Sequence, residues 1–326
     1  MIEASGLRKS YRARRGRKAT TVEAVRGVDF AVQRSEIFGF LGPNGAGKST
    51  TLRMLATLLS PDGGDATIAG ADLRRAPAQV RQRIGFVAQA SGTYSQSFAR
   101  RDLVHQARMY GASKSAAKIA AEAAIAAFQL EGFADRKIGT YSGGQRRRLD
   151  VALGVIHSPL VIFLDEPTAG LDPPSRARMW QEVRRLRDQG MTIFLTTHYL
   201  DEADALCDRI SIIDAGLIVA EGTPSDLKRE ISGDVVIVDL AAADTAGAPE
   251  PATILEASKI LNEQPCVQSC ETIDHTLRLY VDSGATAIPQ IMRALSNKGI
   301  ELGAVETRRP SLDDVFLAKT GRTLAD

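Results

Sequence analysis

The chain has 326 residues, of which 44% are hydrophobic and 25% are charged, and its formal net charge is +2. This length favours two domains, and this composition excludes a largely disordered chain because it supplies enough apolar side chains for a core. The balance of 41 basic and 39 acidic residues gives no overall field for a polyanion, so we do not expect nucleic acid as a partner.

Cysteine usage and hydropathy indicate the compartment. Only three cysteines occur (Cys207, Cys266 and Cys270), which disfavours a disulfide framework and fits a reducing compartment. The longest apolar stretch without charge, residues 151–164, is shorter than the roughly 20 residues of a membrane span, and the N-terminus lacks a secretory signal pattern. We therefore expect a soluble protein that acts at a membrane only through a partner.

The chain begins with a basic segment and continues with alternating strand and helix patterns. Seven basic residues lie between Arg8 and Lys18, and we expect a solvated loop insertion there rather than a patch for nucleic acid or anionic lipid. Strand patterns follow at residues 28–32, 36–41, 160–164, 192–195 and 210–213, and helix patterns at 48–58, 175–189 and 200–207. This alternation predicts an α/β fold with a mostly parallel sheet covered on both faces.

Two parts of the chain depart from this alternation. Residues 101–110 and 113–128 have helical patterns without a strand between Gln89 and Tyr141, which predicts a helical insertion. After residue 230 the predicted strands (235–240, 266–273, 276–281, 300–307) and helices (252–262, 285–297) follow the β-α-β-β-α-β order of a ferredoxin-like unit, and Ser311 and Asp314 cap a last helix. We predict an α/β domain over residues 1–230, with a helical subdomain at about 90–140, and a small α+β ferredoxin-like domain over 234–326 for regulation or dimerisation.

Residues 42–50 form a phosphate-binding motif. They match G-x-x-x-x-G-K-[ST], directly after a predicted strand and before a predicted helix. The glycines allow backbone N–H groups to face phosphate oxygens, Lys48 reaches the β and γ phosphates, and Ser49 offers its hydroxyl to Mg²⁺. The glycine spacing excludes the G-x-G-x-x-G pattern of a dinucleotide site. The predicted nucleotide-binding residues here are Gly42, Pro43, Asn44, Gly45, Ala46, Gly47, Lys48, Ser49 and Thr50.

A carboxylate pair follows the apolar strand at 161–164. Asp165 and Glu166 point in different directions because they are successive residues at a strand end. Such a pair is also typical of an ordinary polar strand exit, but the phosphate-binding loop favours a functional role. We assign Asp165 to the metal ion and Glu166, as the catalytic base, to the attacking water.

A second Ser/Gly-rich helix start, Tyr141-Ser142-Gly143-Gly144-Gln145, precedes a basic helix. It is also an anion site by its backbone pattern. Since the first loop already supplies the N–H donors that one triphosphate uses, this signature segment (residues 141–145) suggests a nucleotide bound between two chains.

These pieces together resemble the ATP-binding-cassette (ABC) ATPases over about residues 3–230. They stand in the order of that family: Tyr11, the loop at 42–50, Gln89, the signature segment, Leu164-Asp165-Glu166-Pro167, Gly170-Leu171-Asp172, and His198 after Thr196-Thr197. The resemblance implies that Tyr11 stacks on adenine, that Gln89 contacts Mg²⁺ and senses a permease, and that His198 contacts the γ-phosphate. It also implies that Ser142, Gly143, Gly144 and Gln145 bind the partner chain's ATP and that Asp172 communicates across the dimer.

Within this family, the single cassette and the C-terminal sequence SLDDVFL at 311–317, followed by Thr320-Gly321, resemble the daunorubicin-resistance type of bacterial exporter ATPase. The resemblance implies an ATP-binding and ATP-hydrolysing subunit with Mg²⁺, peripheral on the cytoplasmic face of the cell membrane. It would pair with a second cassette, as a homodimer, and drive export of a hydrophobic drug, antibiotic or lipid through a separate membrane permease. We expect Tyr94, Phe98, Arg100 and Arg101 to form the surface that receives the permease.

Two alternatives stay open at this stage. A soluble ABC ATPase of nucleic-acid repair or translation would be expected to carry a long coiled-coil insertion or a second cassette, and neither pattern occurs. A P-loop GTPase would be expected to carry an N-K-x-D-like motif and would not explain residues 141–145.

Overall fold

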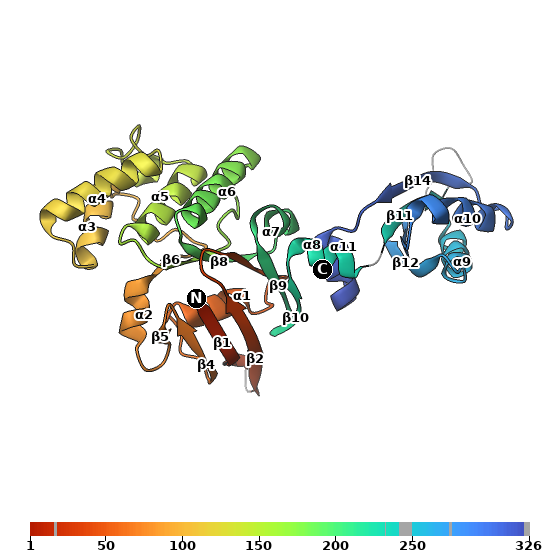
Figure 1. Cartoon of the computed structure of the whole chain (residues 1–326), viewed down its shortest axis with the longest axis horizontal. Helices are drawn as coiled ribbons and strands as arrows, with labels where there is room; N and C mark the ends of the chain where they lie inside the picture. Colours follow the sequence, from red (N-terminus) through yellow and green to blue (C-terminus); the bar gives the residue numbers. More distant parts are fainter. Residues whose placement is uncertain (16–17, 232, 241–249, 274–275, 323–326) are drawn as a thin grey trace. The chain divides into compact units, whose positions relative to one another are not determined.

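The computed structural model describes residues 1–15, 18–231, 233–240, 250–273 and 276–322. The chain divides into two compact units, the first over Met1–Pro224 and the second over Ser225–Thr323 (Figure 1). No helix in the described ranges is long and apolar enough to cross a bilayer.

The first unit contains a six-stranded sheet in the order β10-β9-β3-β8-β7-β6. Its central strands are parallel, and only the edge strand β10 runs antiparallel to its neighbour. The strands are β3 (Ile37–Leu41), β6 (Ile84–Val87), β7 (Val161–Asp165), β8 (Thr192–Thr197), β9 (Arg209–Asp214) and β10 (Leu217–Gly222). Strands β3, β7 and β8 are buried along their whole length, as expected for continuous apolar runs in a parallel sheet. The predicted α/β class is confirmed.

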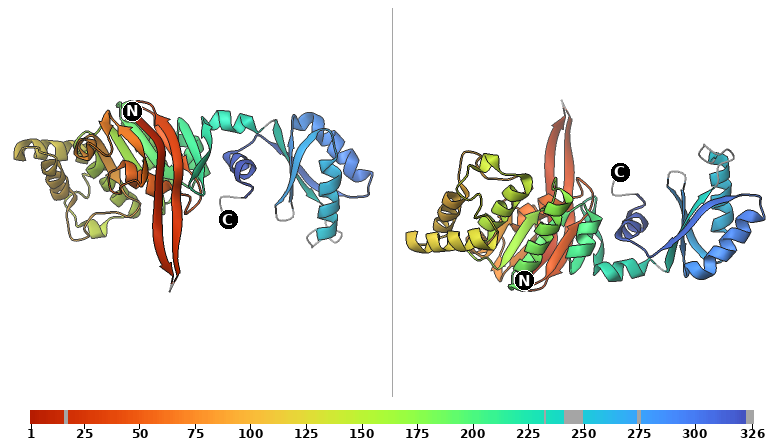
Figure 2. Two further views of the ribbon diagram at one scale, coloured as in Figure 1. Left: turned by 90° about the horizontal axis from the view of Figure 1, so that it is seen from below. Right: turned by 90° about the horizontal axis from the view of Figure 1, so that it is seen from above.

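A separate antiparallel sheet, which the sequence patterns did not predict, has the order β2-β1-β4-β5. It consists of β1 (Ile2–Arg15), β2 (Lys18–Val32), β4 (Gly63–Ile68) and β5 (Ala71–Asp72). Strands β1 and β2 pair as far as Arg15 opposite Lys18, whereas β4 accompanies β1 only as far as Arg8. The arms of β1 and β2 therefore project as a two-stranded ribbon (Figure 2).

This ribbon corrects the expected loop insertion in the basic segment. Residues 8–15 are paired strand, and only residues 16–17 of the run lie outside the described part. The opposite arm carries Thr20, Thr21 and Val22, whose β-branched side chains favour an extended backbone, and each arm satisfies the hydrogen bonds of the other.

Helices cover the parallel sheet and form the helical insertion. They are α1 (Lys48–Leu55), α2 (Pro77–Arg83), α3 (Ala99–Met109), α4 (Lys114–Ala127), the 3₁₀ turn η1 (Ile138–Thr140), α5 (Gly143–Val155), α6 (Pro173–Asp188) and α7 (Leu200–Leu206). The insertion contains α3 and α4, which lie side by side (Figure 1). Helix α1 ends three residues before the predicted position because Thr57 adopts φ +60°, which turns the chain out of the helix.

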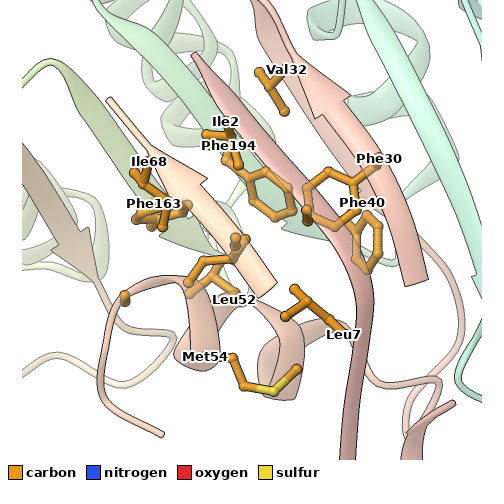
Figure 3. Packing of buried hydrophobic residues seen from close by; sticks show 14 of the residues in the cluster. Ile2, Leu7, Phe30, Val32, Phe40, Leu52, Met54, Ile68, Phe163 and Phe194 are labelled. Atoms are coloured by element: carbon orange, nitrogen blue, oxygen red, sulfur yellow. The ribbon is translucent and has the colours of Figure 1, made fainter. Parts of the chain in front are cut away.

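An aromatic cluster joins the two sheets of the first unit (Figure 3). Phe30 of β2 packs against Phe38 and Phe40 of β3 and against Phe194 of β8, with ring centroids 5.8, 5.5 and 5.7 Å apart. Leu52 of α1 is fully buried in the same core. This packing fixes the end of β3, and therefore the loop that follows it, against β8 and α1.

The second unit begins with α8 (Pro224–Glu230) and has a four-stranded antiparallel sheet in the order β12-β13-β11-β14. Its further elements are β11 (Asp234–Leu240), α9 (Pro251–Asn262), β12 (Val267–Ile273), β13 (Thr276–Val281), α10 (Gly284–Ser296), β14 (Leu302–Arg308) and α11 (Leu312–Thr320). Helices α9 and α10 cover one face of this sheet (Figure 2). The ferredoxin-like order is confirmed, while residues 274–275, between two of the predicted strands, and most of the chain between β11 and α9 lie outside the described residues.

The last helix is attached to the second unit through a buried carboxylate. Asp314 is fully buried and accepts hydrogen bonds from the backbone and hydroxyl groups of Ser311, at 2.8 and 2.7 Å. Arg308 donates to Asp314 at 2.9 Å, and Arg278 lies 3.6 Å from it. The sequence-predicted cap of α11 is therefore present, and it also joins the helix to β13 and β14.

Candidate functional site

Four segments that carry predicted site residues follow neighbouring strands of the parallel sheet. The loop at 42–47 follows β3, residues 198–199 follow β8, Glu166 follows β7 and Gln89 follows β6. These strands are adjacent in the order β3-β8-β7-β6 and parallel, so their carboxyl ends lie at one edge of the sheet. That edge is where α/β proteins bind ligands.

Glycine is required at two positions of the phosphate-binding loop by the backbone itself. A Cβ atom on Gly42 would lie 2.2 Å from the carbonyl oxygen of Ile213. Gly47 adopts φ +107°, and a Cβ there would lie 2.4 Å from the carbonyl oxygen of Ala24. Neither contact is possible for a residue with a side chain, so β2 and β9 hold the loop close to the start of α1.

The lysine of the loop is buried and already oriented. Lys48 is 4% exposed, and its ammonium donates to the carbonyl oxygens of Gly42 at 2.7 Å and Pro43 at 3.0 Å. Burial lowers the pKa of Lys48, an effect that the nearby Glu166 and Asp165 carboxylates partly oppose. The first N–H groups of α1 have no partner within the helix, as at any helix start, and Lys48 stands beside them. The end of this loop thus combines free backbone donors with a positive charge.

The other residues of the loop differ in exposure. Asn44 and Gly45 are exposed, Ala46 is buried, and Pro43, Ser49 and Thr50 are partly buried.

The two carboxylate oxygens of Asp165 differ in their hydrogen bonding. Its Oδ1 accepts from the hydroxyl groups of Ser49 at 2.8 Å and Thr196 at 2.7 Å. Its Oδ2 is buried and has no hydrogen-bond partner in the described part of the chain. A buried carboxylate oxygen next to a hydroxyl group is the donor set that Mg²⁺ takes from proteins, so Ser49 and Asp165 fit this ion. Thr196 was not predicted as a site residue, although its place near the end of the buried strand β8, two residues before His198, is the signal that identifies it.

Glu166 is the most constrained residue of the site. It is 6% exposed and adopts φ +45°, and its N–H donates to both the carbonyl and the hydroxyl oxygen of Thr196 at 3.1 Å. Its carboxylate meets the amide of Gln89 at 2.8 Å, Nδ1 of His198 at 3.2 Å and the ammonium of Lys48 at 3.6 Å. A left-handed backbone at a residue other than glycine is strained, and such strain is typical of functional sites.

Gln89 is the residue whose contacts differ from its expected role. Its side-chain amide donates to Glu166, whereas no hydrogen bond joins it to Ser49 or Asp165 in the described chain. A Mg²⁺ contact of Gln89 therefore stays a prediction, and its observed position is that of an orienting group for Glu166.

The signature segment forms a second, separate arrangement with Asp172. Ser142 caps α5 through a capping box with Gln145, with hydrogen bonds of 3.2 and 3.0 Å, and Asp172 caps α6 by accepting from the N–H of Ser175. A Cβ on Gly144 would lie 2.7 Å from the hydroxyl oxygen of Ser175, so α5 and α6 start close together. Hydrogen bonding to Ser175 lowers the pKa of Asp172.

The signature segment is open to solvent. Ser142 and Gly143 are exposed, and in the described chain no hydrogen bond joins residues 142–145 to the phosphate-binding loop. Tyr11 is also separate: it lies on β1 opposite Val22 with 40% of its surface exposed. The roles of these residues towards a nucleotide stay predictions.

A groove lies beside Gln89 in the first unit. It has a volume of about 650 Å³ and is lined by β6, the chain after Gln89 and α3, including Phe86, Ala88, Tyr94, Arg101 and Tyr110. Tyr94 is the most exposed large hydrophobic residue of this groove, at 72%. Of the four residues expected to receive a permease, Tyr94 and Arg101 line the groove, while the Arg100 guanidinium pairs with Glu122 and Asp135.

Comparison with known proteins agrees with both units. Residues 25–169 match the ABC transporter family, and residues 222–320 match the C-terminal domain of ATP-binding proteins of the DrrA1-3 type. The chain is 39% identical to the daunorubicin resistance ATP-binding protein DrrA2 of Streptomyces coeruleorubidus, over 98% of this chain and 95% of that protein. It is 41% identical to the daunorubicin/doxorubicin resistance ATP-binding protein DrrA of Streptomyces peucetius, over 100% of this chain and 94% of that protein. A solved dimeric bacterial ABC transporter cassette matches with a TM-score of 0.62 and 25% identity, over 68% of this chain and 98% of that one.

Proposed function

Because this chain belongs to the ATP-binding proteins of ABC transporters and carries a C-terminal domain of the DrrA1-3 type, we propose that it powers a bacterial exporter through a separate membrane permease. The observation that carries the proposal is the convergence of Lys48, the unpartnered Asp165 Oδ2 and Glu166 at one edge of the sheet. The chain is an ATP hydrolase by family, and the proposal concerns which residues act and on what.

The first step is binding of the triphosphate by the loop and the start of α1. The Lys48 ammonium exchanges the carbonyls of Gly42 and Pro43 for β and γ phosphate oxygens, and the free N–H groups of α1 face the same oxygens. Ser49 and Asp165 Oδ2 would hold Mg²⁺, which neutralises charge on the phosphates. Tyr11, which is partly exposed on β1, is proposed to stack on the adenine.

The second step is attack of water on the γ-phosphate, with Glu166 as the base; the bond from the γ-phosphorus to the β–γ bridging oxygen breaks, and ADP is the leaving group. The Glu166 carboxylate takes the proton of the water. Its orientation is set by Gln89, which donates to Oε2, and by His198, which lies next to Oε1. The two hydrogen bonds from the Glu166 N–H to Thr196 keep the residue in its strained conformation, so the carboxylate is oriented before the substrate arrives. His198 is then placed to contact the γ-phosphate.

We further propose that two copies of the chain close over two nucleotides. Ser142 and Gly143 are exposed, so they are accessible to a second chain, and the helix start behind them favours an anion. Gly144 and Gln145 shape this helix start, and Asp172 lies beside it on α6. The dimeric cassette among the similar solved structures supports this arrangement.

The groove beside Gln89 is proposed to receive a cytoplasmic segment of the permease, which would keep this chain on the cytoplasmic face of the membrane. Ala88 and Ala90 line the groove on either side of Gln89, so a segment seated there is one residue from the Glu166 contact. The names of the relatives support a hydrophobic drug or antibiotic, or a lipid of similar character, as the exported molecule. They support the exporter over an ATPase of nucleic-acid repair or translation.

The assignment of Lys48 to the phosphates is tested by measuring ATP binding in the variant Lys48→Ala. Loss of a charged hydrogen-bond donor predicts a fall in ATP affinity of about 10- to 100-fold. Wild-type affinity in this variant would contradict the assignment.

The test of the docking assignment is cysteine cross-linking of Tyr94→Cys to a co-expressed permease. Leu255→Cys, on α9 and 60% exposed, serves as the matched control in the second unit, and the unaltered chain controls for the native cysteines. Cross-links from Tyr94→Cys alone support the groove; cross-links from Leu255→Cys alone would show that the second unit receives the permease.

A further inference from the structure

Arg147 is a buried arginine on α5 whose hydrogen bonds all go to backbone carbonyls. It is 6% exposed. Its Nε donates to Pro167 at 2.8 Å and its Nη1 to Ala88 at 2.5 Å. Its Nη2 donates to Asp165 at 2.9 Å and to Glu166 at 3.3 Å. One guanidinium therefore joins α5 to the chain before Gln89 and to the turn that contains Glu166.

These contacts place Arg147 behind the Gln89–Glu166 hydrogen bond. Ala88 directly precedes Gln89, and Glu166 is one of the residues whose carbonyl Arg147 binds. The Gln89 amide and the Glu166 carboxylate are 2.8 Å apart, and Arg147 binds both the carbonyl of the residue before Gln89 and the carbonyl of Glu166. Arg147 itself does not contact the Glu166 carboxylate, so any effect on hydrolysis is transmitted through backbone positions.

Burying the charge of Arg147 costs free energy, which argues against a role in filling space alone. Burial lowers the pKa of Arg147, although the fields of Asp150, Asp165 and Glu202 act in the opposite direction. In the described chain no ion pair to Arg147 lies within 4.0 Å, so its direct hydrogen-bond partners are carbonyl oxygens and the acidic groups act on it from a distance. An apolar side chain of similar volume would fill the space without burying a charge. What it would not provide is the planar set of donors that reaches carbonyls in several directions.

We propose that Arg147 is a positioning residue that fixes the Gln89 segment and the Glu166 turn relative to the signature helix α5, so that the two side chains meet in the geometry for hydrolysis. The inference rests on the proposed function, since Gln89 and Glu166 act together only in that reaction. A lysine at this position carries the charge but has a single nitrogen, so it cannot replace the four hydrogen bonds.

The first experiment compares ATP binding with ATP turnover in full-length Arg147→Lys and Arg147→Gln. Arg184→Lys is the matched control, because Arg184 also donates to a backbone carbonyl, that of Ala205, and lies outside the site. A positioning role predicts that kcat falls by about 10- to 100-fold while the affinity for ATP changes less than about threefold. Loss of affinity in the same proportion as turnover, or unchanged kcat in Arg147→Lys, would overturn the proposal.

The second experiment is a double-mutant cycle with Gln89→Ala. If Arg147 acts by placing Gln89, the effects on kcat are not additive, and Gln89→Ala costs little more in the Arg147→Lys background. Independent, multiplying effects contradict the proposal, and so does a Gln89→Ala variant with wild-type turnover.

The third experiment does not depend on turnover, so it separates this inference from the proposed function. Amide hydrogen exchange of residues 88–93 and 165–169 should be faster in Arg147→Lys than in the wild-type chain and unchanged in Arg184→Lys. A wild-type chain that binds ATP without hydrolysing it would refute the proposed function, and the exchange result would still decide the role of Arg147. Exchange that is unchanged, or faster throughout the first unit in both Arg147 variants, shows that no specific positioning exists.

Discussion

Replacing Glu166 by glutamine removes the base and keeps most of the contacts around it. The glutamine oxygen can accept from one side of the site, and Gln89 can turn its own amide to accept from the new NH₂ group. Lys48 loses a carboxylate at 3.6 Å but keeps its hydrogen bonds to the carbonyls of Gly42 and Pro43. The folded site and its positive charge therefore survive the change.

The size of the effect follows from what is lost. A positioned general base contributes about 10²- to 10⁴-fold to a rate, which corresponds to about 2.7 to 5.4 kcal/mol of transition-state stabilisation. The affinity for ATP should not fall. With one negative charge fewer beside the phosphates, Glu166→Gln should bind ATP as tightly as the wild-type chain or more tightly. ATP should then hold the variant as a dimer, because closure no longer ends in hydrolysis.

The assay combines phosphate release, nucleotide binding and sedimentation with ATP. Glu36→Gln is the matched control, because Glu36 has the same 6% exposure but pairs with Arg209 at the start of β3, away from the site. Near wild-type phosphate release by Glu166→Gln, in protein that binds ATP normally, would refute the assignment of Glu166 as the base. An equal loss in Glu36→Gln would show that the effect is not specific to the site.

Three further changes test other features of the two units. Gly47→Ala should lower thermal stability by about 1–3 kcal/mol and abolish ATP binding, because the added Cβ meets the Ala24 carbonyl at 2.4 Å; normal affinity would show that the loop is not confined. Asp314→Ala should destabilise the second unit by about 3–5 kcal/mol in denaturant unfolding, because it leaves its arginine partners uncompensated, and ATP binding should be unchanged. Burial raises the pKa of Glu202 above 4.5, so its contribution to stability is complete below pH 4.5 and is lost as pH rises through the raised pKa. Glu202→Gln should therefore gain stability relative to the wild-type chain as pH rises above 4.5, and a pH-independent difference in thermal unfolding would contradict this.

The contiguous motifs were predictable from sequence, and the long-range contacts between them were not. Asp165 and Glu166 stand at the end of an apolar run, and Lys48 and Ser49 follow another one through the loop at 42–47. Parallel strands bring such ends to one edge of a sheet. By contrast, the strained φ of Glu166 and the two bonds that its N–H makes to Thr196 depend on the register of β7 against β8, which no local pattern encodes. The role of Arg147 could not be predicted for the same reason. Its partners are backbone carbonyls, which every residue carries, so no residue type marks them in the sequence.

The antiparallel sheet was missed because its strands break the patterns used to find them. In the ribbon, basic residues dominate β1 from Arg8 onward and β2 begins without an apolar–polar alternation, so the basic segment was interpreted as a loop. Its stability comes from pairing between arms that the sequence does not mark as partners. The signature segment poses a different problem: its residues were found, but their function needs a second chain, and one sequence contains no information on how two copies meet.

The anchored side chain of Lys48 has a consequence for the thermodynamics of nucleotide capture. A free lysine samples many rotamers, and ordering it in a complex costs up to about 2 kcal/mol of conformational entropy. Here the two carbonyls of its own loop already hold the ammonium. That ordering is therefore part of folding, and binding of ATP requires only that the ammonium change its acceptors. The enthalpy of binding should accordingly include the cost of breaking two charged hydrogen bonds, offset by stronger ones to phosphate. The entropy of binding should include little of the loss that ordering a mobile lysine would add.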